Sequence, residues 1–176
     1  VLVIPVDFAA PKGRLILPQQ QVIRDVLDAK GKVAIAQVTE LESLLYGFKN
    51  PPKIVITDSQ AFKEVAEIVP ESVPLTSFSI LMSRYKGDLP LQTRGAKAIT
   101  NLKGGEKILI CEGCTHHRQC GDIGTQKLPK WIREKTGKDF EFEFTSGGDF
   151  PDDLSPYSLI IHCGGCMLPV REIRHR

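Results

Sequence analysis

The sequence predicts an α/β protein built around small parallel sheets with flanking helices. Three short apolar runs near its start are rich in β-branched residues, which is typical of strands covered on both faces. These runs are residues 2–6, 33–38 and 53–57. Segments with apolar residues at helical spacing separate them. Strands that alternate with helices of this length indicate parallel pairing with right-handed crossovers.

Helical patterns fill the gaps between these runs. The first follows Pro18, a residue that suits the first turn of a helix, and its apolar stripe comprises Val22, Ile23, Val26 and Leu27. Two further stripes fall within residues 41–48 and 61–69. The resulting sheet of three or four strands has exposed edges, and edge-to-edge pairing with a second copy would protect them.

A pair of helices separates this part from the next. The first is expected to end at Gly87, and Asp88 can cap the second. The remaining chain is expected to form strand 107–111, helix 127–135, strand 140–144 and strand 157–162. We therefore expect two domains, 1–78 and 79–176, both of the α/β class.

Composition narrows the functions that the chain can serve. Its 176 residues are 41% hydrophobic and 25% charged, and a net charge of +2 with both signs interspersed indicates neither a nucleic-acid surface nor a membrane surface. No apolar run approaches the roughly 18 residues needed to cross a bilayer. Five cysteines are an odd number, and disulfide frameworks belong to shorter secreted chains, so we expect a reducing, cytoplasmic setting. Because the chain opens within an apolar strand and without methionine, we expect further sequence upstream of Val1.

Two cysteine-containing segments carry the strongest functional signal. Cys163 and Cys166 are separated by two glycines, and this spacing lets both thiolates bind one metal ion or cluster. Cys114 lies well upstream, next to Gly113. Both segments follow predicted strands, and the carboxyl ends of parallel strands meet at one edge of a sheet, where ligand sites usually form. We therefore expect the two segments to meet in space, with Cys114 as the third thiolate.

Other interpretations of the cysteines remain open. Cys111 and Cys114 form a second pair at the same spacing, so Cys111, Cys114, Cys163 and Cys166 together could hold a structural zinc ion. Cys111 also ends an apolar strand, and we prefer to interpret it as a buried thiol. A small redox enzyme that uses Cys163 and Cys166 is a weaker alternative, because redox pairs usually begin a helix in a thioredoxin-like unit. Cys120 has no partner at ligand spacing.

Strand geometry distinguishes the two histidines beside these cysteines. In extended backbone, His116 points to the same side as Cys114, whereas His162 points away from Cys163. We therefore expect His116 to be a possible fourth ligand. We expect His162 to support the site through a hydrogen bond without binding the metal itself.

Three thiolates have a different chemical consequence from four. An iron–sulfur cubane held by three cysteines leaves one iron with a weak or exchangeable ligand. Such an iron can bind a second metal fragment or a small ligand. Four thiolates would close the site and make it structural or purely electron-transferring.

The complete pattern resembles the signature of HydF, the maturation GTPase family of FeFe-hydrogenases. It consists of Cys114-x-His116, forty-five further residues, and His162-Cys163-x-x-Cys166. Other segments that resemble this family are residues 11–19, 75–80, 84–89 and 111–116. The resemblance covers essentially the whole chain.

This resemblance implies a scaffold or carrier protein. HydF-like proteins have an N-terminal GTPase domain, a middle dimerisation domain and a C-terminal iron–sulfur domain, and they carry the two-iron precursor of the hydrogenase active site. The resemblance assigns a 4Fe-4S cluster to Cys114, Cys163 and Cys166, and the two motif histidines to His116 and His162. The implied partners are a second copy through the first domain, apo FeFe-hydrogenase and the radical-SAM maturation proteins.

One element of the family pattern is missing. The chain contains no Gly-x-x-x-x-Gly-Lys-Ser/Thr loop, whose backbone amides would bind nucleotide phosphates. We therefore expect this chain to correspond to the last two domains, to bind no GTP and to contain no catalytic residue. The expected function is delivery of the diiron precursor to apo-hydrogenase from a cluster with an exchangeable fourth position. A structural zinc protein is the alternative.

Overall fold

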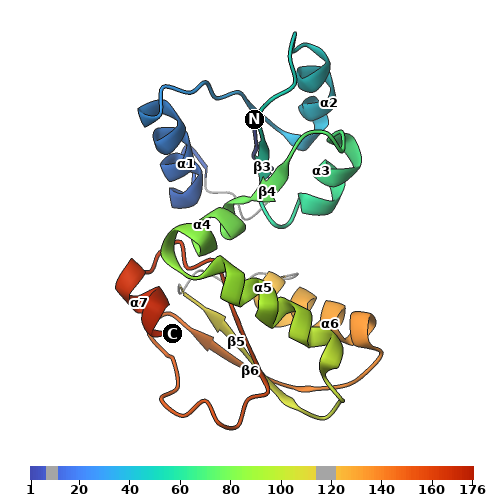
Figure 1. Ribbon diagram of the computed structural model, residues 1–176, viewed down its shortest axis with the longest axis vertical. Coiled ribbons are helices and arrows are strands. Elements are labelled where there is room, and N and C mark those ends of the chain that lie inside the picture. Colours follow the sequence, from blue (N-terminus) through green and yellow to red (C-terminus); the bar gives the residue numbers. More distant parts are fainter. Residues whose placement is uncertain (7–11, 114–121) are drawn as a thin grey trace. The chain divides into compact units, whose positions relative to one another are not determined.

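The chain folds into two compact units, each built on a parallel sheet (Figure 1). A computed structural model describes residues 1–6, 12–113 and 122–176. Unit 1 comprises Val1–Met82 and unit 2 comprises Ser83–Arg176. The predicted α/β class is confirmed, and the division between the units falls within helix α4 (Phe78–Lys86).

Unit 1 contains a four-stranded parallel sheet in the order β2-β1-β3-β4. Strands and helices alternate along the chain as β1 (Leu2–Val3), α1 (Leu17–Asp28), β2 (Ile35–Ala36), α2 (Val38–Tyr46), β3 (Val55–Thr57), α3 (Phe62–Ile68) and β4 (Leu75–Ser77). The apolar pattern did not reveal β4, because three residues with one buried side chain give no periodic signal.

The core of unit 1 forms between the central strands and the helices α2 and α3. Val3 of β1, Val55 of β3 and Val65 of α3 are fully buried and share one cluster with Leu41 of α2. Burying each of these side chains stabilises the unit by about 1.5–3 kcal/mol. The apolar stripes in the sequence therefore mark the helix faces that cover the sheet.

β2 forms one edge of this sheet. The N–H groups of Leu2 and Ile4 donate to the carbonyls of Ala34 and Ala36, both at 2.9 Å. In a parallel pair, successive residues direct their backbone polar groups to opposite sides, so the N–H and C=O of Ile35 face away from β1. Ile35 is 50% exposed, and within the described ranges no strand pairs with this side of β2.

Ile35→Pro is expected to weaken self-association without unfolding unit 1. Proline removes an N–H that faces the open edge, and edge strands tolerate it, whereas a partner strand would lose a ladder hydrogen bond worth about 1 kcal/mol. Light scattering after size exclusion should show weaker dimers, by roughly fivefold in Kd. Ile35→Thr keeps the N–H and is the control. Wild-type dimerisation of the proline variant would show that another surface pairs the copies.

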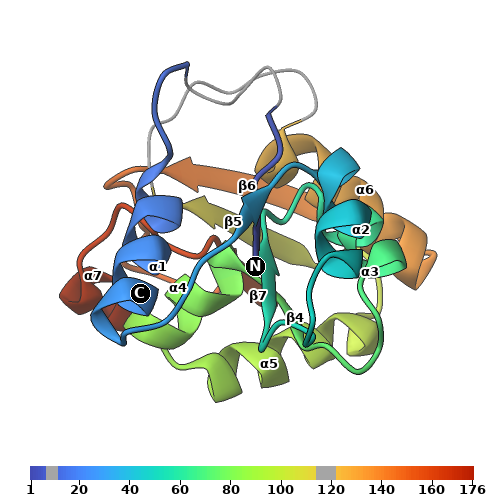
Figure 2. The ribbon, with the colours of Figure 1, turned by 90° about the horizontal axis from the view of Figure 1, so that it is seen from above.

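Unit 2 contains a three-stranded parallel sheet in the order β6-β5-β7. Its elements are α5 (Leu89–Ala98), η1 (Ile99–Asn101), β5 (Lys107–Glu112), η2 (Ile123–Lys127), α6 (Leu128–Thr136), β6 (Glu141–Ser146), β7 (Leu159–His162) and α7 (Val170–His175). Figures 1 and 2 both show β5 and β6 side by side. Asp88 caps α5 as predicted, because its carboxylate accepts the Leu91 N–H at 2.9 Å.

The central strand β5 is buried on both faces. Ile108 and Ile110 lie on one face and share a core cluster with Ile132 of α6. The alternation of a strand places Leu109 and Cys111 on the opposite face, and all four of these strand residues are at most 2% exposed. Burial on both faces explains why the sequence of β5 is a continuous apolar run without alternating polar residues.

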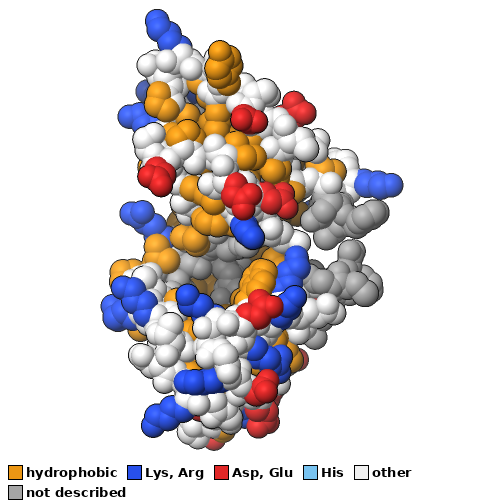
Figure 3. Space-filling view, turned by 90° about the vertical axis from the view of Figure 1, so that its right-hand side faces the viewer, with side chains coloured by type: hydrophobic (Ala, Val, Ile, Leu, Met, Phe, Trp, Pro, Cys, Tyr) orange, Lys and Arg blue, Asp and Glu red, His pale blue; other side chains and the backbone are white. Residues whose placement is uncertain are grey.

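The described surface carries charges of both signs. On the face drawn in Figure 3, Lys and Arg side chains are interspersed with Asp and Glu side chains, in keeping with the net charge of +2. None of the helices in the described part of the chain combines the length and hydropathy of a membrane span.

Candidate metal centre

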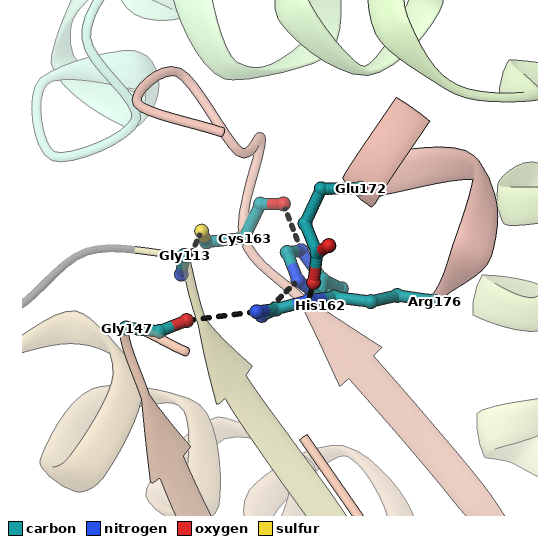
Figure 4. A network of polar contacts seen from close by, with 6 residues as sticks. All are labelled: Gly113, Gly147, His162, Cys163, Glu172 and Arg176. Atoms are coloured by element: carbon teal, nitrogen blue, oxygen red, sulfur yellow. Dashed lines mark hydrogen bonds and ion pairs between the residues drawn. The ribbon is translucent and has the colours of Figure 1, made fainter. Parts of the chain in front are cut away.

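The candidate site lies where β5 and β7 end. Cys111 of β5 is in register with His162 of β7, and the Cys163 N–H donates to the Cys111 carbonyl at 3.0 Å. One residue beyond β5, the Gly113 N–H donates to the Cys163 sulfur at 3.1 Å (Figure 4). Gly113 immediately precedes Cys114 in the sequence. The predicted meeting of the two strand ends is therefore confirmed.

The structure describes part of the predicted ligand set. Cys163, Cys166 and His162 are described, and the predicted residues outside the described ranges are Cys114, His116 and Cys120. Within residues 1–6, 12–113 and 122–176, no group of three or more metal-ligating side chains occurs. The described residues thus supply two of the three predicted thiolates.

The Cys163 sulfur accepts two backbone hydrogen bonds. One comes from the Gly113 N–H at 3.1 Å and the other from the Gly165 N–H at 3.4 Å. Burial alone would raise the pKa of this thiol, but the polar contact with His162 and the two N–H groups lower the pKa below its ordinary value. These contacts favour the thiolate, which is the form that binds metals. The residue as a whole is exposed, so a ligand can reach it.

Cys166 lies half-buried at the other end of the same loop. Burial and the neighbouring Cys163 raise the pKa of the Cys166 thiol. The charge of Lys86 and the N–H groups of Met167 and Cys166 lower this pKa but do not outweigh burial. The Cys163 sulfur therefore receives two backbone hydrogen bonds, and the Cys166 thiol lies under the influence of the Lys86 charge. Two thiols in one loop, with two N–H groups directed at the first and a cation near the second, suit an iron–sulfur cluster, so the residues present fit such a group.

Two glycines allow this close approach of backbone to sulfur. A Cβ on Gly165 would collide with Cδ1 of Ile173, and this glycine has a φ of 60°. A Cβ on Gly113 would lie 2.8 Å from Cδ1 of Leu168. A side chain at either position would push the backbone N–H away from the Cys163 sulfur.

His162 is held in place by Arg176. One guanidinium nitrogen of Arg176 lies 3.3 Å from Nε2 of His162, and another donates to the Gly147 carbonyl at 2.8 Å (Figure 4). Nε of Arg176 also donates to the Glu172 carboxylate at 2.8 Å. The Arg176 side chain is only 2% exposed, so these contacts fix its position.

The contacts of His162 assign its tautomer. A guanidinium only donates, so Nε2 accepts in the neutral ring, and Nδ1 donates to the Cys163 carbonyl at 2.7 Å. Burial and the Arg176 charge lower the pKa of His162, but the contacts with Cys163 outweigh them and raise this pKa above its ordinary value. We assign the neutral form because only that form accepts the Arg176 hydrogen bond. In this arrangement both ring nitrogens are used within the protein.

Cys111 lies in a different environment from the loop cysteines. Its side chain is completely buried on the sheet face opposite Ile108. Burial raises the pKa of the Cys111 thiol, and the neighbouring Thr145 hydroxyl of β6 and the Arg176 charge only partly oppose this effect. A raised thiol pKa disfavours the thiolate that a zinc ion requires. The geometry therefore favours a buried thiol at this position.

Two residues of the site were not predicted, Lys86 and Arg176. Lys86 is the last residue of α4, and its ammonium binds the loop that carries Cys163. A signal for it was available, because Phe78, Met82 and Lys86 recur every fourth residue and all three are buried. No comparable signal marks Arg176, whose contact with His162 depends on how α7 packs.

Models of known families match both halves of the chain. Residues 1–87 match the hydrogen maturase F dimerization domain, and residues 90–176 match the hydrogen maturase F tetramerization domain. A comparison with curated proteins found no match.

Proposed function

We propose that this chain, which belongs to the hydrogen maturase F family, binds a 4Fe-4S cluster through Cys114, Cys163 and Cys166. The family assignment indicates a role in hydrogenase maturation, and the two matched domains support self-association. The observation that carries the cluster proposal is the hydrogen bond from the Gly113 N–H to the Cys163 sulfur at 3.1 Å. It joins the strand end that precedes Cys114 to the loop that holds the other two thiols.

The described residues have separate roles in this proposal. Cys163 and Cys166 donate thiolates, and the N–H groups of Gly113 and Gly165 stabilise negative charge on the Cys163 sulfur. His162 holds the backbone that follows β7. A cluster bound by three cysteines supplies one iron with an exchangeable ligand. His116 or an external ligand is proposed to occupy that position between transfers.

The proposed cargo is the diiron precursor of the hydrogenase active site. The radical-SAM maturation proteins would supply this precursor in the cytoplasm, and apo FeFe-hydrogenase would accept it. Transfer needs only a higher affinity of the acceptor for the precursor, so this chain needs no bond-making residue of its own. In this scheme the chain is not an enzyme, and GTP acts on a separate domain of the family.

Metal analysis of anaerobically reconstituted protein tests the cluster proposal. The protein is incubated with iron and sulfide under reducing conditions, desalted, and assayed for iron, acid-labile sulfide and zinc. The expected result is a brown protein with roughly four irons per chain and an EPR signal on reduction. A colourless, folded protein that retains stoichiometric zinc would reject the proposal and favour the zinc alternative.

Cys111→Ala separates the cluster from a four-thiolate zinc site. The cluster proposal predicts unchanged iron content and an unchanged EPR signal, with a loss of about 1 kcal/mol in the free energy of unfolding from the lost packing. A zinc site of Cys111, Cys114, Cys163 and Cys166 would instead lose its metal. Leu109→Ala is the matched control, because it truncates a buried residue on the same strand face.

A further inference from the structure

We infer that Lys86 is the positioning residue of the loop from Cys163 to Cys166. By binding the carbonyl groups of Gly165, Cys166 and Leu168, Lys86 fixes the conformation of this loop and places a positive charge beside its cysteines. This role deepens the proposed function and rests on it where the cluster is concerned. The arrangement of the metal-free loop can be tested separately.

Lys86 is a buried lysine with a full set of partners. It is 6% exposed, and its Nζ donates to the carbonyls of Gly165 at 3.0 Å, Cys166 at 2.7 Å and Leu168 at 2.8 Å. A protonated lysine has three N–H donors, so each donor has one carbonyl. Burying an ammonium group is unfavourable unless its donors are satisfied. These bonds therefore tie the end of α4 to the loop.

Peptide geometry determines what this contact does to the loop. In a trans peptide unit, the C=O of one residue and the N–H of the next point in opposite directions. Lys86 holds the carbonyls of Gly165 and Cys166, so the N–H groups of Cys166 and Met167 point away from the lysine. The Lys86 ammonium, 2.7 Å from the Cys166 carbonyl, also places its charge beside the Cys166 thiol and so opposes the burial that raises the pKa of this thiol.

The consequence for a bound cluster follows from charge. Hydrogen bonds to cysteine sulfur and a nearby positive charge both stabilise the more negative, reduced state of an iron–sulfur cluster. Lys86 is therefore expected to raise the reduction potential and to slow the loss of iron. A lysine that served only the stability of the fold would change neither property in a protein that remains folded and loaded.

Three variants test this role in the complete chain. Lys86→Met keeps an unbranched side chain but removes the donors and the charge. Lys86→Arg keeps the charge, but its planar fork does not reproduce three converging hydrogen bonds. Arg84→Met removes a charge from an exposed position on the same helix and is the matched control. Each protein is checked by circular dichroism, reconstituted anaerobically, and measured by EPR-monitored redox titration and by iron release to a chelator.

The expected result is a graded series. Lys86→Met should lower the reduction potential by about 59 mV, a tenfold change in the ratio of reduced to oxidised cluster, and should release iron several-fold faster. Lys86→Arg should fall between Lys86→Met and wild type, and Arg84→Met should match wild type. Wild-type behaviour of a folded Lys86→Met protein would overturn the inference, and so would an equal shift in Arg84→Met. If Lys86→Met does not fold, a wild-type potential in Lys86→Arg would overturn it.

Hydrogen exchange of the metal-free protein tests the loop without the cluster. Lys86→Met should accelerate exchange of the Leu168 N–H several-fold, because this group donates to the Gly165 carbonyl at 3.0 Å and Lys86 holds the same carbonyl, while Arg84→Met should not. Unchanged exchange of the Leu168 N–H would overturn the inference. Failure of the wild-type protein to bind iron would reject the proposed function but would not alter this result, so the two failures are distinguishable.

Discussion

Cys163→Ser is expected to abolish the iron–sulfur absorbance and EPR signal of the reconstituted protein while leaving its fold intact. A serine hydroxyl is a harder ligand than a thiolate and stays protonated at neutral pH. The N–H groups of Gly113 and Gly165, at 3.1 Å and 3.4 Å from the Cys163 sulfur, would then face a neutral hydroxyl. Because Cys163 is exposed, the exchange should cost little packing energy. Iron content, visible absorbance and circular dichroism measure these outcomes together.

A second substitution in the same loop controls for damage to its conformation. Met167 is 60% exposed, so Met167→Ser changes the loop without removing a proposed ligand. This variant should retain its iron. Full iron content and a wild-type EPR signal in Cys163→Ser would contradict the ligand assignment. Loss of iron in both variants would attribute the effect to loop folding.

Gly165→Ala is expected to disrupt the loop by a purely steric route. The glycine has a φ of 60°, which costs an alanine about 1 kcal/mol, and the new Cβ would collide with Cδ1 of Ile173. Overpacking of this kind typically costs a further 1–3 kcal/mol. The backbone of Gly165 also donates to the Cys163 sulfur and accepts from Lys86. Denaturant unfolding should show a free energy of unfolding lower by about 2–4 kcal/mol, together with reduced iron binding.

Two companion variants separate the causes of this effect. Gly148→Ala places a methyl group in open space within the same unit and should be nearly neutral. Ile173→Val removes the Cδ1 atom but keeps Cγ1, which lies 3.0 Å from the added Cβ. The double variant with Gly165→Ala should therefore recover most of the steric part, and about 1 kcal/mol from the left-handed backbone should remain. Wild-type stability of Gly165→Ala alone would show that the loop relaxes around the added methyl group.

Most of the fold could be predicted because its signals are local. β5 is a continuous apolar run, which is the pattern of a central parallel strand, and the structure places it between β6 and β7. The cap at Asp88 could also be predicted, because it is formed by one side chain and the N–H of Leu91, three residues further along the chain. Strand β4 could not be predicted from the sequence pattern, because its pairing with β3 depends on where the chain returns to the sheet after α3.

The candidate site was predictable to a lesser degree. Cysteine spacing and the direction of parallel strands together predicted that Gly113 and the Cys163 loop would meet. The surroundings of Cys111, which decide between a buried thiol and a zinc ligand, depend on its neighbours across the sheet. Arg176 reaches His162 only because α7 packs against the end of β7.

The parallel α/β architecture and the position of the cysteine loop at a strand end follow from the sequence, because side-chain period and residue spacing are properties of short segments. Which groups face the sulfurs depends on how distant segments pack together. The Gly113 N–H and the Cys163 sulfur are 50 residues apart in the chain, and Lys86 and the Gly165 carbonyl are 79 apart. Hydrogen bonds depend on atomic positions within a few tenths of an ångström, and only the packing of distant segments sets those positions.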